Sequence, residues 1–208
     1  MRLLHLVARR GNSLRSAIAL GVRFIEIEVR LANDGTPLVC PDQDLAETLS
    51  LLEGRPEITV FVMIGRASVL RFGQEQVVAR IARTLRPFRS RCIVGSADLP
   101  TVHAARSLAG YPIAWELSSY DAHTRLKYEA LQPEYIFCDR AHLPVHGQLW
   151  RGPWRWGISE VETLESALAL AERGADFVIT RHVRSLSEAM LSHSAATTHS
   201  KLEWVKRS

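Results

Sequence analysis

Phe24-Ile25-Glu26-Ile27-Glu28-Val29 has the pattern of a buried β-strand that carries two carboxylates on one face. Side chains alternate across a strand, so Glu26 and Glu28 point to one side and the aliphatic side chains to the other. Two buried like charges are costly unless a cation compensates them. We therefore expect this strand to lie at a metal or catalytic site. The alternative is an internal ion pair with an arginine, and Arg30 continues the same face.

Short apolar runs alternate with amphipathic helical stretches along the chain, which predicts βα units and a parallel sheet. Eight such runs fit a closed (β/α)8 TIM barrel in a short form, because 208 residues is close to the lower limit of about 200 for that fold. An open doubly wound sheet is the alternative, but no glycine-rich phosphate loop follows the first run. The runs cover residues 2–7, 24–29, 58–64, 92–95, 113–117, 135–138, 154–158 and 177–180.

A turn signal, Asn33-Asp34-Gly35, separates the second run from a further short apolar run over residues 37–40. Asp-Gly turns are typical of β-hairpins. We therefore expect a β-hairpin excursion after the second strand instead of a direct crossover to a helix.

Length and composition indicate one globular domain, with 47% hydrophobic and 23% charged residues. Residues 1–191 are expected to form the barrel and residues 192–208 a loosely ordered tail. The net charge of +4 is mild, and the basic residues are expected to be scattered over the surface, so no nucleic-acid partner is expected. No segment has the length of a membrane span or a signal peptide, which predicts a cytoplasmic protein. The sequence gives no indication of oligomeric state.

Several polar residues are expected at the C-terminal ends of the strands, which is the active end of a β/α barrel. Glu26 and Glu28 lie near the end of the second strand, and His5 near the end of the first. A histidine beside two carboxylates suits acid–base chemistry next to a hard divalent cation. Glu116 ends the fifth strand and is a third candidate ligand, and Arg181 follows the last strand, where it could hold an anionic group.

The order of these features resembles the glycerophosphodiester phosphodiesterase family. Residues 24–39 are similar to its strand-two motif Ile-Glu-x-Asp-Val with the following Asp-Gly-x-Pro-Val-Val turn, and Cys40-Pro41-Asp42 stands where the family has His-Asp. Trp156-Gly157-Ile158-Ser159 resembles Trp-Thr-Val-Asn, and residues 174–181 resemble the closing Gly-x-Asp-Gly-Ile-Ile-Thr-Asp. The similarity spans nearly the whole chain, and its first and last blocks are the specific ones.

The resemblance implies a metal-dependent phosphoric diester hydrolase barrel of lipid and glycerophosphodiester metabolism. Two histidines would act as acid and base, acidic residues from two strands would bind Ca2+ or Mg2+, and a lysine would stabilise the phosphate of a small-molecule phosphodiester. The first histidine opens a His-Arg-Gly motif after strand one. We assign it to His5, although a second register places Arg9-Arg10-Gly11 on the motif and leaves no histidine.

The chain departs from the family at further functional positions. Pro41 stands in place of the second histidine, and a proline cannot transfer a proton. Met63-Ile64-Gly65 stands in place of a Glu-x-Lys, so a metal ligand and the phosphate-binding lysine are missing there. Loss of one general acid or base typically lowers the rate by about 10²–10⁴-fold. We therefore expect a catalytically degenerate member that acts as a ligand-binding or interaction protein, without a cofactor.

Two alternatives stay open at this point. One is a weakly active or repurposed metal-dependent phosphodiesterase, and the other is an unrelated β/α-barrel enzyme. The residues that the first alternative requires are Glu26, Glu28 and His5 for metal binding and catalysis, Glu116 or Asp42 as a further ligand, and Arg9, Arg10 or Arg181 for the phosphate.

Overall fold

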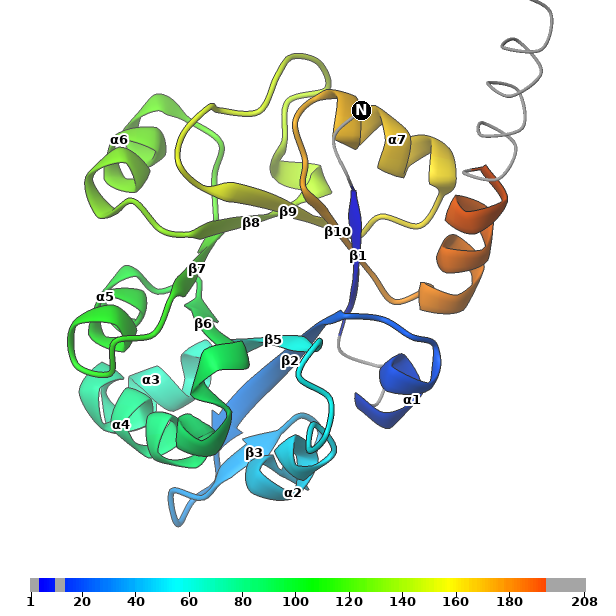
Figure 1. The fold of residues 1–208 in the computed structure, drawn as a ribbon. Helices are drawn as coiled ribbons and strands as arrows, with labels where there is room; N and C mark the ends of the chain where they lie inside the picture. The colour runs from blue at the N-terminus through cyan, green and yellow to red at the C-terminus, as the bar shows by residue number, and fades with distance from the viewer. Residues whose placement is uncertain (1–3, 10–13, 194–208) are drawn as a thin grey trace, which may run out of the picture.

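The chain forms a closed β/α barrel, seen in the computed structural model of residues 4–9 and 14–193. The barrel strands are β1 (His5–Ala8), β2 (Phe24–Leu31), β5 (Thr59–Ile64), β6 (Cys92–Ser96), β7 (Ile113–Leu117), β8 (Tyr135–Asp139), β9 (Arg155–Ser159) and β10 (Phe177–Thr180). Each is parallel to its neighbours, and β1 pairs with both β10 and β2, which closes the ring (Figure 1). The predicted (β/α)8 barrel is confirmed, and the open sheet is excluded.

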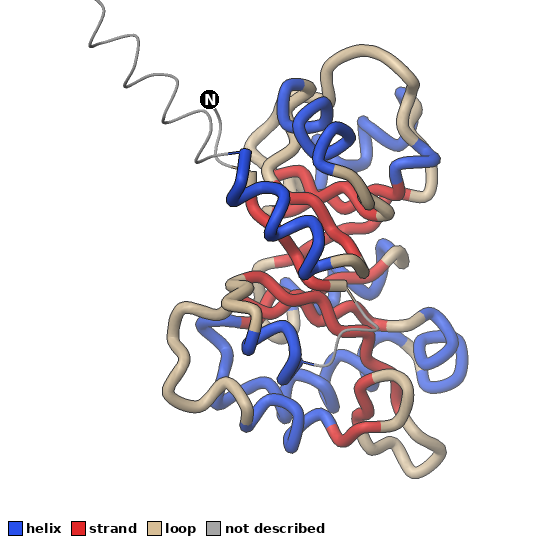
Figure 2. Tube along the Cα trace, turned by 90° about the vertical axis from the view of Figure 1, so that its right-hand side faces the viewer, coloured by secondary structure: helices blue, strands red, loops and turns tan. Residues whose placement is uncertain are grey.

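Helices cover the outside of the ring, and the strands form a band between them in the side view (Figure 2). They are α1 (Leu14–Ala19), α2 (Leu45–Ser50), α3 (Arg66–Phe72), α4 (Gln74–Leu85), α5 (Leu99–Ser107), α6 (Ala122–Leu131) and α7 (Leu164–Glu172), with the 3-10 segments η1 (Arg86–Arg91) and η2 (Arg140–His142). A last helix covers residues 183–193, so the first two residues of the expected tail are helical. The rest of that tail lies outside the described residues. Among the described helices, none is long and apolar enough to cross a membrane.

Aspartates cap the helices that follow β6 and β7. The Asp98 carboxylate accepts a hydrogen bond of 3.0 Å from the Thr101 backbone N–H at the start of α5. Asp121 accepts one of 2.8 Å from the Thr124 N–H at the start of α6. Such caps satisfy backbone donors that the first helical turn leaves open. They help to keep the turns after the strands short at the end of the barrel where polar side chains gather.

Aromatic and aliphatic side chains fill the interior of the barrel. The members of this inner cluster are Val7, Phe61, Met63, Ile93, Ala114, Phe137, Phe177 and Ile179. Phe61 and Phe137 pack edge to face with ring centroids 4.8 Å apart. A Cβ added at Gly157 would come within 2.7 Å of the Phe137 ring, so the large ring requires a glycine opposite it. A filled interior leaves no pore, and a site therefore has to lie at an end of the barrel.

The expected hairpin excursion is present on β2. β3 (Pro37–Val39) pairs antiparallel with the end of β2, and β4 (Gln43–Asp44) pairs with β3. Gly35 has φ of +85° in the turn, a backbone conformation that glycine adopts without strain. The Cys40 N–H donates to the Glu28 carbonyl at 2.9 Å. This pairing holds the segment after the hairpin against the edge of the acidic strand.

A loop over residues 143–154 follows η2 and is held in place by α7 and by aromatic stacking. Arg173, at the end of α7, donates hydrogen bonds of 2.8 Å to the Gly147 and Pro144 carbonyls. Trp150 stacks on Tyr120 with ring centroids 4.1 Å apart. The indole N–H of the buried Trp156 on β9 donates to the Trp150 carbonyl at 2.9 Å, which ties the loop to the barrel.

Gly157→Ala is expected to lower the free energy of unfolding by about 1–3 kcal/mol, because the added methyl overpacks the barrel interior. Urea denaturation measures this loss. Since the clash is with a side chain, the double variant Gly157→Ala/Phe137→Leu should lose less than the sum of the two single losses. Strictly additive losses would show that the glycine is not required by the Phe137 ring.

Candidate functional site

A cavity of about 580 Å³ opens at the C-terminal ends of the strands. It lies where the active end of a β/α barrel is expected. Met63, Gly65, Ser96 and Ser118 contribute to its wall. Its charged lining residues are Arg9, Glu26, Glu28, Arg66, Asp98 and Glu116. Four carboxylates therefore face two guanidinium groups.

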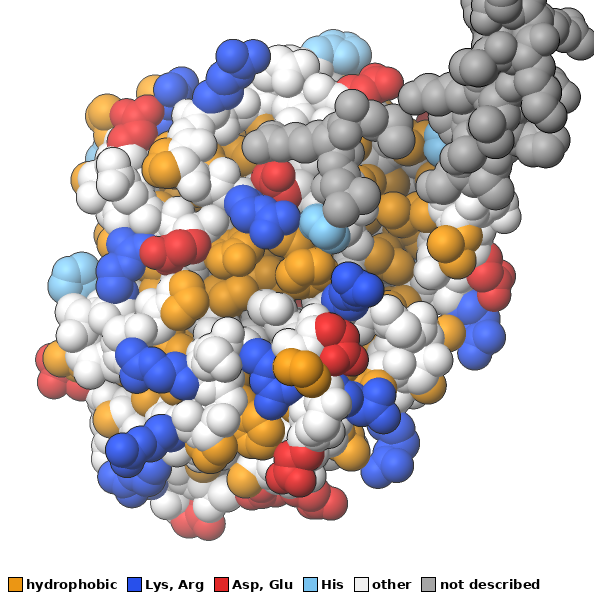
Figure 3. Space-filling view, viewed as in Figure 1, with side chains coloured by type: hydrophobic (Ala, Val, Ile, Leu, Met, Phe, Trp, Pro, Cys, Tyr) orange, Lys and Arg blue, Asp and Glu red, His pale blue; other side chains and the backbone are white. Residues whose placement is uncertain are grey.

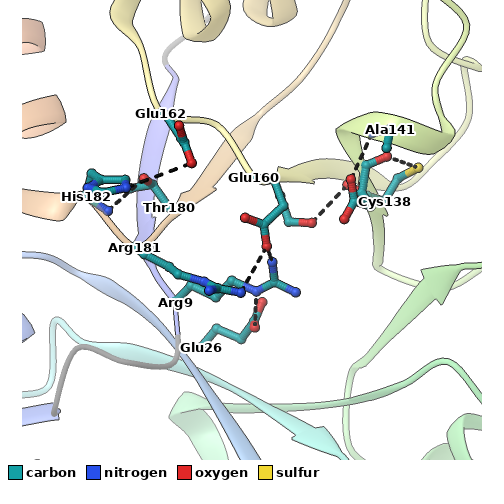
Figure 4. A network of polar contacts seen from close by, with 11 residues as sticks. Arg9, Glu26, Cys138, Ala141, Glu160, Glu162, Thr180, Arg181 and His182 are labelled. Atoms are coloured by element: carbon teal, nitrogen blue, oxygen red, sulfur yellow. Dashed lines mark hydrogen bonds and ion pairs between the residues drawn. The ribbon is translucent and has the colours of Figure 1, made fainter.

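Four charged side chains form a continuous chain of ion pairs at this end of the barrel (Figure 4). Arg9 Nε lies 3.4 Å from Glu26 Oε1, and Arg9 Nη1 pairs with Glu160 Oε1. Arg181 Nη2 lies 3.4 Å from the same Glu160 oxygen. We call Arg181, Glu160, Arg9 and Glu26 the mouth ion-pair chain. Its members come from the ends of β10, β9 and β1 and from β2, which are neighbours in the sheet.

Burial makes the central pair of this chain the important one. The side chains of Arg9 and Glu26 are only 11% and 9% exposed, whereas that of Arg181 is 56% exposed. A buried carboxylate needs a cation or several hydrogen-bond donors nearby to remain charged at an acceptable cost. Arg9 supplies this cation to Glu26 from the neighbouring strand.

The ion pair that the sequence left as the alternative is therefore present, but with a different arginine. Arg30 continues the acidic face of β2 and pairs instead with Asp42 beyond the hairpin. It also lies 3.3 Å from the Pro41 carbonyl oxygen. Asp42 is thus held by Arg30 at the surface and is not among the residues lining the cavity.

The expected position of His5 at the mouth is wrong. His5 is the first residue of β1, level with Phe177 at the start of β10. Its ring packs against Phe24 and Phe177, with centroids 5.0 and 5.4 Å away, at the opposite end of the barrel. The residue that follows β1 at the mouth is Arg9, as in the second register considered above. Arg10, the other arginine of that register, lies outside the described residues.

Glu26, Glu28 and Glu116 line one cavity, as the prediction of three metal ligands requires. However, no three His, Cys, Asp or Glu side chains in the described part of the chain are grouped closely enough to hold a metal ion. The cation beside Glu26 is the Arg9 guanidinium. This donor set does not fit a resident Ca2+ or Mg2+, because a positively charged side chain already occupies the neighbourhood of the most buried carboxylate.

Three further positions carry no side chain that can transfer a proton, hold a hard metal ion or bind phosphate. Pro41 follows the hairpin through a cis peptide bond, and Met63 lines the cavity with its thioether side chain. Gly65 also lines the cavity, and a Cβ added there would lie 3.4 Å from Glu28 Oε1. A side chain at this position would therefore contact the second carboxylate of the acidic strand.

Glu160 is the member of the mouth ion-pair chain that the sequence analysis missed, and it also missed Arg66 and Asp98 in the lining of the cavity. Glu160 follows β9 directly and has φ of +58°, a left-handed conformation that non-glycine residues adopt infrequently. A carboxylate immediately after a late strand is the only sequence signal that could have indicated it. In the sequence, its partner Arg9 lies 151 residues before it and its partner Arg181 lies 21 residues after it.

No family model and no curated protein matches this chain. Several solved structures have a similar fold at low sequence identity. A phosphodiesterase of Oleispira antarctica, solved with its product sn-glycerol-3-phosphate, superposes with a TM-score of 0.74 at 14% identity over 90% of this chain and 97% of that one. A glycerophosphodiester phosphodiesterase of Parabacteroides distasonis gives 0.75 at 11% identity over 93% and 99%. A further one, of Thermotoga maritima, gives 0.65 at 15% over 91% and 99%. At such identities the likeness establishes the fold.

Arg9→Ala should lower the free energy of unfolding by about 3 kcal/mol, because it removes the cation beside a buried carboxylate. Arg181→Ala is the matched control and should cost less than about 1 kcal/mol, since its side chain is largely exposed. Urea denaturation measures both. Ca2+ should raise the melting temperature of Arg9→Ala more than that of the parent protein, because a divalent ion could then take the place of the guanidinium. Equal losses in both variants would contradict the role given to Arg9.

The His5 imidazole should make the protein less stable in mild acid. Burial, followed by the positive charge of Arg155, lowers the pKa of His5 below its ordinary 6.5, and Arg23 adds to this while Asp176 opposes it. The unfolded chain then binds the proton more readily, so the free energy of unfolding falls as the pH decreases from about 6.5 towards the folded pKa. His5→Gln should flatten this dependence in urea titrations. If the free energy of unfolding depends on pH in the same way in both proteins, His5 is not the group responsible.

Proposed function

We propose that this chain is a glycerophosphodiester phosphodiesterase-like barrel that does not hydrolyse phosphodiesters and acts as a ligand-binding or interaction protein. The likeness of its strand-two and closing motifs to that family, together with its fold, supports the family assignment. The observation that carries the loss of activity is the Arg9 guanidinium between Glu26 and Glu160 at the mouth of the barrel.

The chemistry of phosphodiester cleavage supports this proposal. A hydrolase of this kind needs a base for the nucleophile, an acid for the leaving group and positive charge on the phosphate. At the family's two histidine positions this chain has Arg9 and Pro41, and an arginine keeps its proton at any physiological pH. The losses act on the same step, so they do not simply multiply, but the combined deficit is large.

The charge of the cavity also disfavours an unassisted phosphodiester. Four carboxylates and two guanidinium groups line it, so an anionic ligand would be repelled unless its phosphate paired directly with a cation of the lining. Arg66, an exposed residue of the lining, is the group with which a small phosphate ligand would pair. The volume of about 580 Å³ suits a small molecule. The sn-glycerol-3-phosphate held by the Oleispira antarctica phosphodiesterase makes such a phosphate ester the first ligand to test.

A weakly active metal-dependent phosphodiesterase is the second candidate. Its support is the presence of Glu26, Glu28 and Glu116 in one cavity. It would require Arg9 to swing away from Glu26 so that a divalent ion could bind. It would also have to work without a histidine at either of the family's catalytic positions.

The purified protein should show no hydrolysis of glycerophosphodiesters with Ca2+, Mg2+ or Mn2+ above that of its double variant Glu26→Gln/Glu28→Gln. Release of sn-glycerol-3-phosphate measures turnover, and thermal melting confirms that the variant is folded. Metal-dependent turnover that the double variant lacks would overturn the proposal and give the glutamates a catalytic role.

Calorimetric titration with sn-glycerol-3-phosphate extends this experiment to the binding role. Heat of binding that is lost in Arg66→Gln would support a retained ligand cavity. If neither turnover nor binding is detected, the interaction role is the part of the proposal that remains.

A further inference from the structure

Positive charge is concentrated in one stretch of the chain, residues 66–91. It holds seven of the 26 basic residues and one of the 22 acidic ones, Glu75, so its formal charge is +6 and that of the remaining chain −2. The expectation that basic residues are scattered is therefore wrong for this stretch. We call its basic residues the arginine face: Arg66, Arg71, Arg80, Arg83, Arg86, Arg89 and Arg91.

The fold places the arginine face on one side of the barrel. α3, α4 and η1 follow one another directly, and α3 packs against α4. α4 buries Val77, Val78, Ile81 and Leu85 towards the barrel, which leaves its arginines on the outward side. Five of the seven arginines are exposed and the other two half-buried. Lys and Arg side chains gather over this region at the lower left of the molecule (Figure 3).

Few neighbouring carboxylates offset the charge of the arginine face, and Asp34, whose charge interacts with that of Arg80, is one of them. No ion pair within the described residues involves any of its members. Their guanidinium groups donate instead to neutral oxygens, such as that of Arg89 to the Gly110 carbonyl at 2.8 Å and that of Arg91 to the Arg55 carbonyl at 2.6 Å. Such bonds orient the side chains while their full charge remains available to an anionic partner.

Apolar groups accompany these charges. Leu70 on α3 is 75% exposed and lies next to Arg71 in the chain. The guanidinium carbons of Arg71 and Arg91 lie 5.1 and 5.3 Å from the ring centroids of Phe72 and Phe88. Phe72 and Phe88 are half-buried against the core, so Leu70 supplies the exposed apolar group beside these arginines. An exposed aliphatic group beside arginines is typical of surfaces that rest in the headgroup layer of a membrane.

We infer that the arginine face docks on an anionic phospholipid surface. Spread positive charge and an exposed aliphatic group both strengthen binding to an anionic lipid bilayer. Only the positive charge would contribute to binding a nucleic acid. Sequence recognition in its grooves normally requires an inserted helix or strand. Arg66 belongs both to this face and to the lining of the cavity. Docking would therefore bring one edge of the cavity to the lipid surface.

Vesicle co-sedimentation of the full chain tests this inference. The protein should bind vesicles of phosphatidylcholine and phosphatidylserine, not vesicles of phosphatidylcholine alone, and binding should weaken as salt screens the charges. The triple variant Arg71→Gln/Arg83→Gln/Arg86→Gln should reduce the partition coefficient by about 100-fold, since each charge near the surface contributes roughly a fivefold factor. Leu70→Ser should reduce vesicle binding several-fold and leave binding to heparin unchanged.

The matched control removes the same charge from elsewhere on the surface. Arg15, Arg151 and Arg184 are exposed and lie outside the arginine face, so Arg15→Gln/Arg151→Gln/Arg184→Gln should bind vesicles nearly as well as the parent. Equal losses in both triple variants would show that only net charge matters and would overturn the inference. Tighter binding to RNA or DNA than to the vesicles, lost in the first triple variant and unaffected by Leu70→Ser, would replace the lipid with a nucleic acid.

Discussion

A buried carboxylate in the middle of a barrel strand is the constraint on which the site depends. Glu26 is 8% exposed, so its charge must be compensated within the protein. In a metal-dependent barrel a divalent ion would serve this purpose. Here the Arg9 guanidinium does so from the adjacent strand, and Glu160 holds the other side of that guanidinium. Once the compensating charge is part of the chain, the acidic strand no longer needs an ion to be stable.

The presence of a guanidinium in place of a divalent ion also changes the chemistry that is possible at the mouth of the barrel. A metal ion brings a Lewis acid and open coordination positions, whereas a guanidinium brings only fixed donors that already have partners. The mouth ion-pair chain links the ends of β9, β10 and β1 to β2 around the point where β1 closes the ring. It thus contributes to the closure of the barrel at the place where the family's chemistry would otherwise occur.

Arginine has opposite roles in two parts of this protein. At the mouth, the buried Arg9 is neutralised by Glu26 and Glu160 and has become part of the structure. On α3, α4 and η1, arginines donate to neutral carbonyl oxygens and keep their charge exposed. Burial explains the difference, because a charge must be paired where water is excluded and need not be where water remains. The charge of Arg9 at the mouth is thus paired within the protein, whereas the arginine face presents its charge to the solvent.

The sequence by itself determined the features that depend on local pattern. Alternating strand and helix periodicities gave the barrel, Asp34-Gly35 gave the hairpin on β2, and Pro41 showed that a proton-transferring residue was missing. Only the tertiary structure decided which residue after the first strand reaches the mouth. His5 is the first residue of β1, and Arg9 follows its last residue. The pairing of β1 with β10 and β2 determines which end of the barrel each of them reaches, and no local pattern encodes this pairing. The partner of Arg9 was hidden for a similar reason: Glu160 lies 151 residues further along the chain, and a contact at that distance arises only when the ring closes.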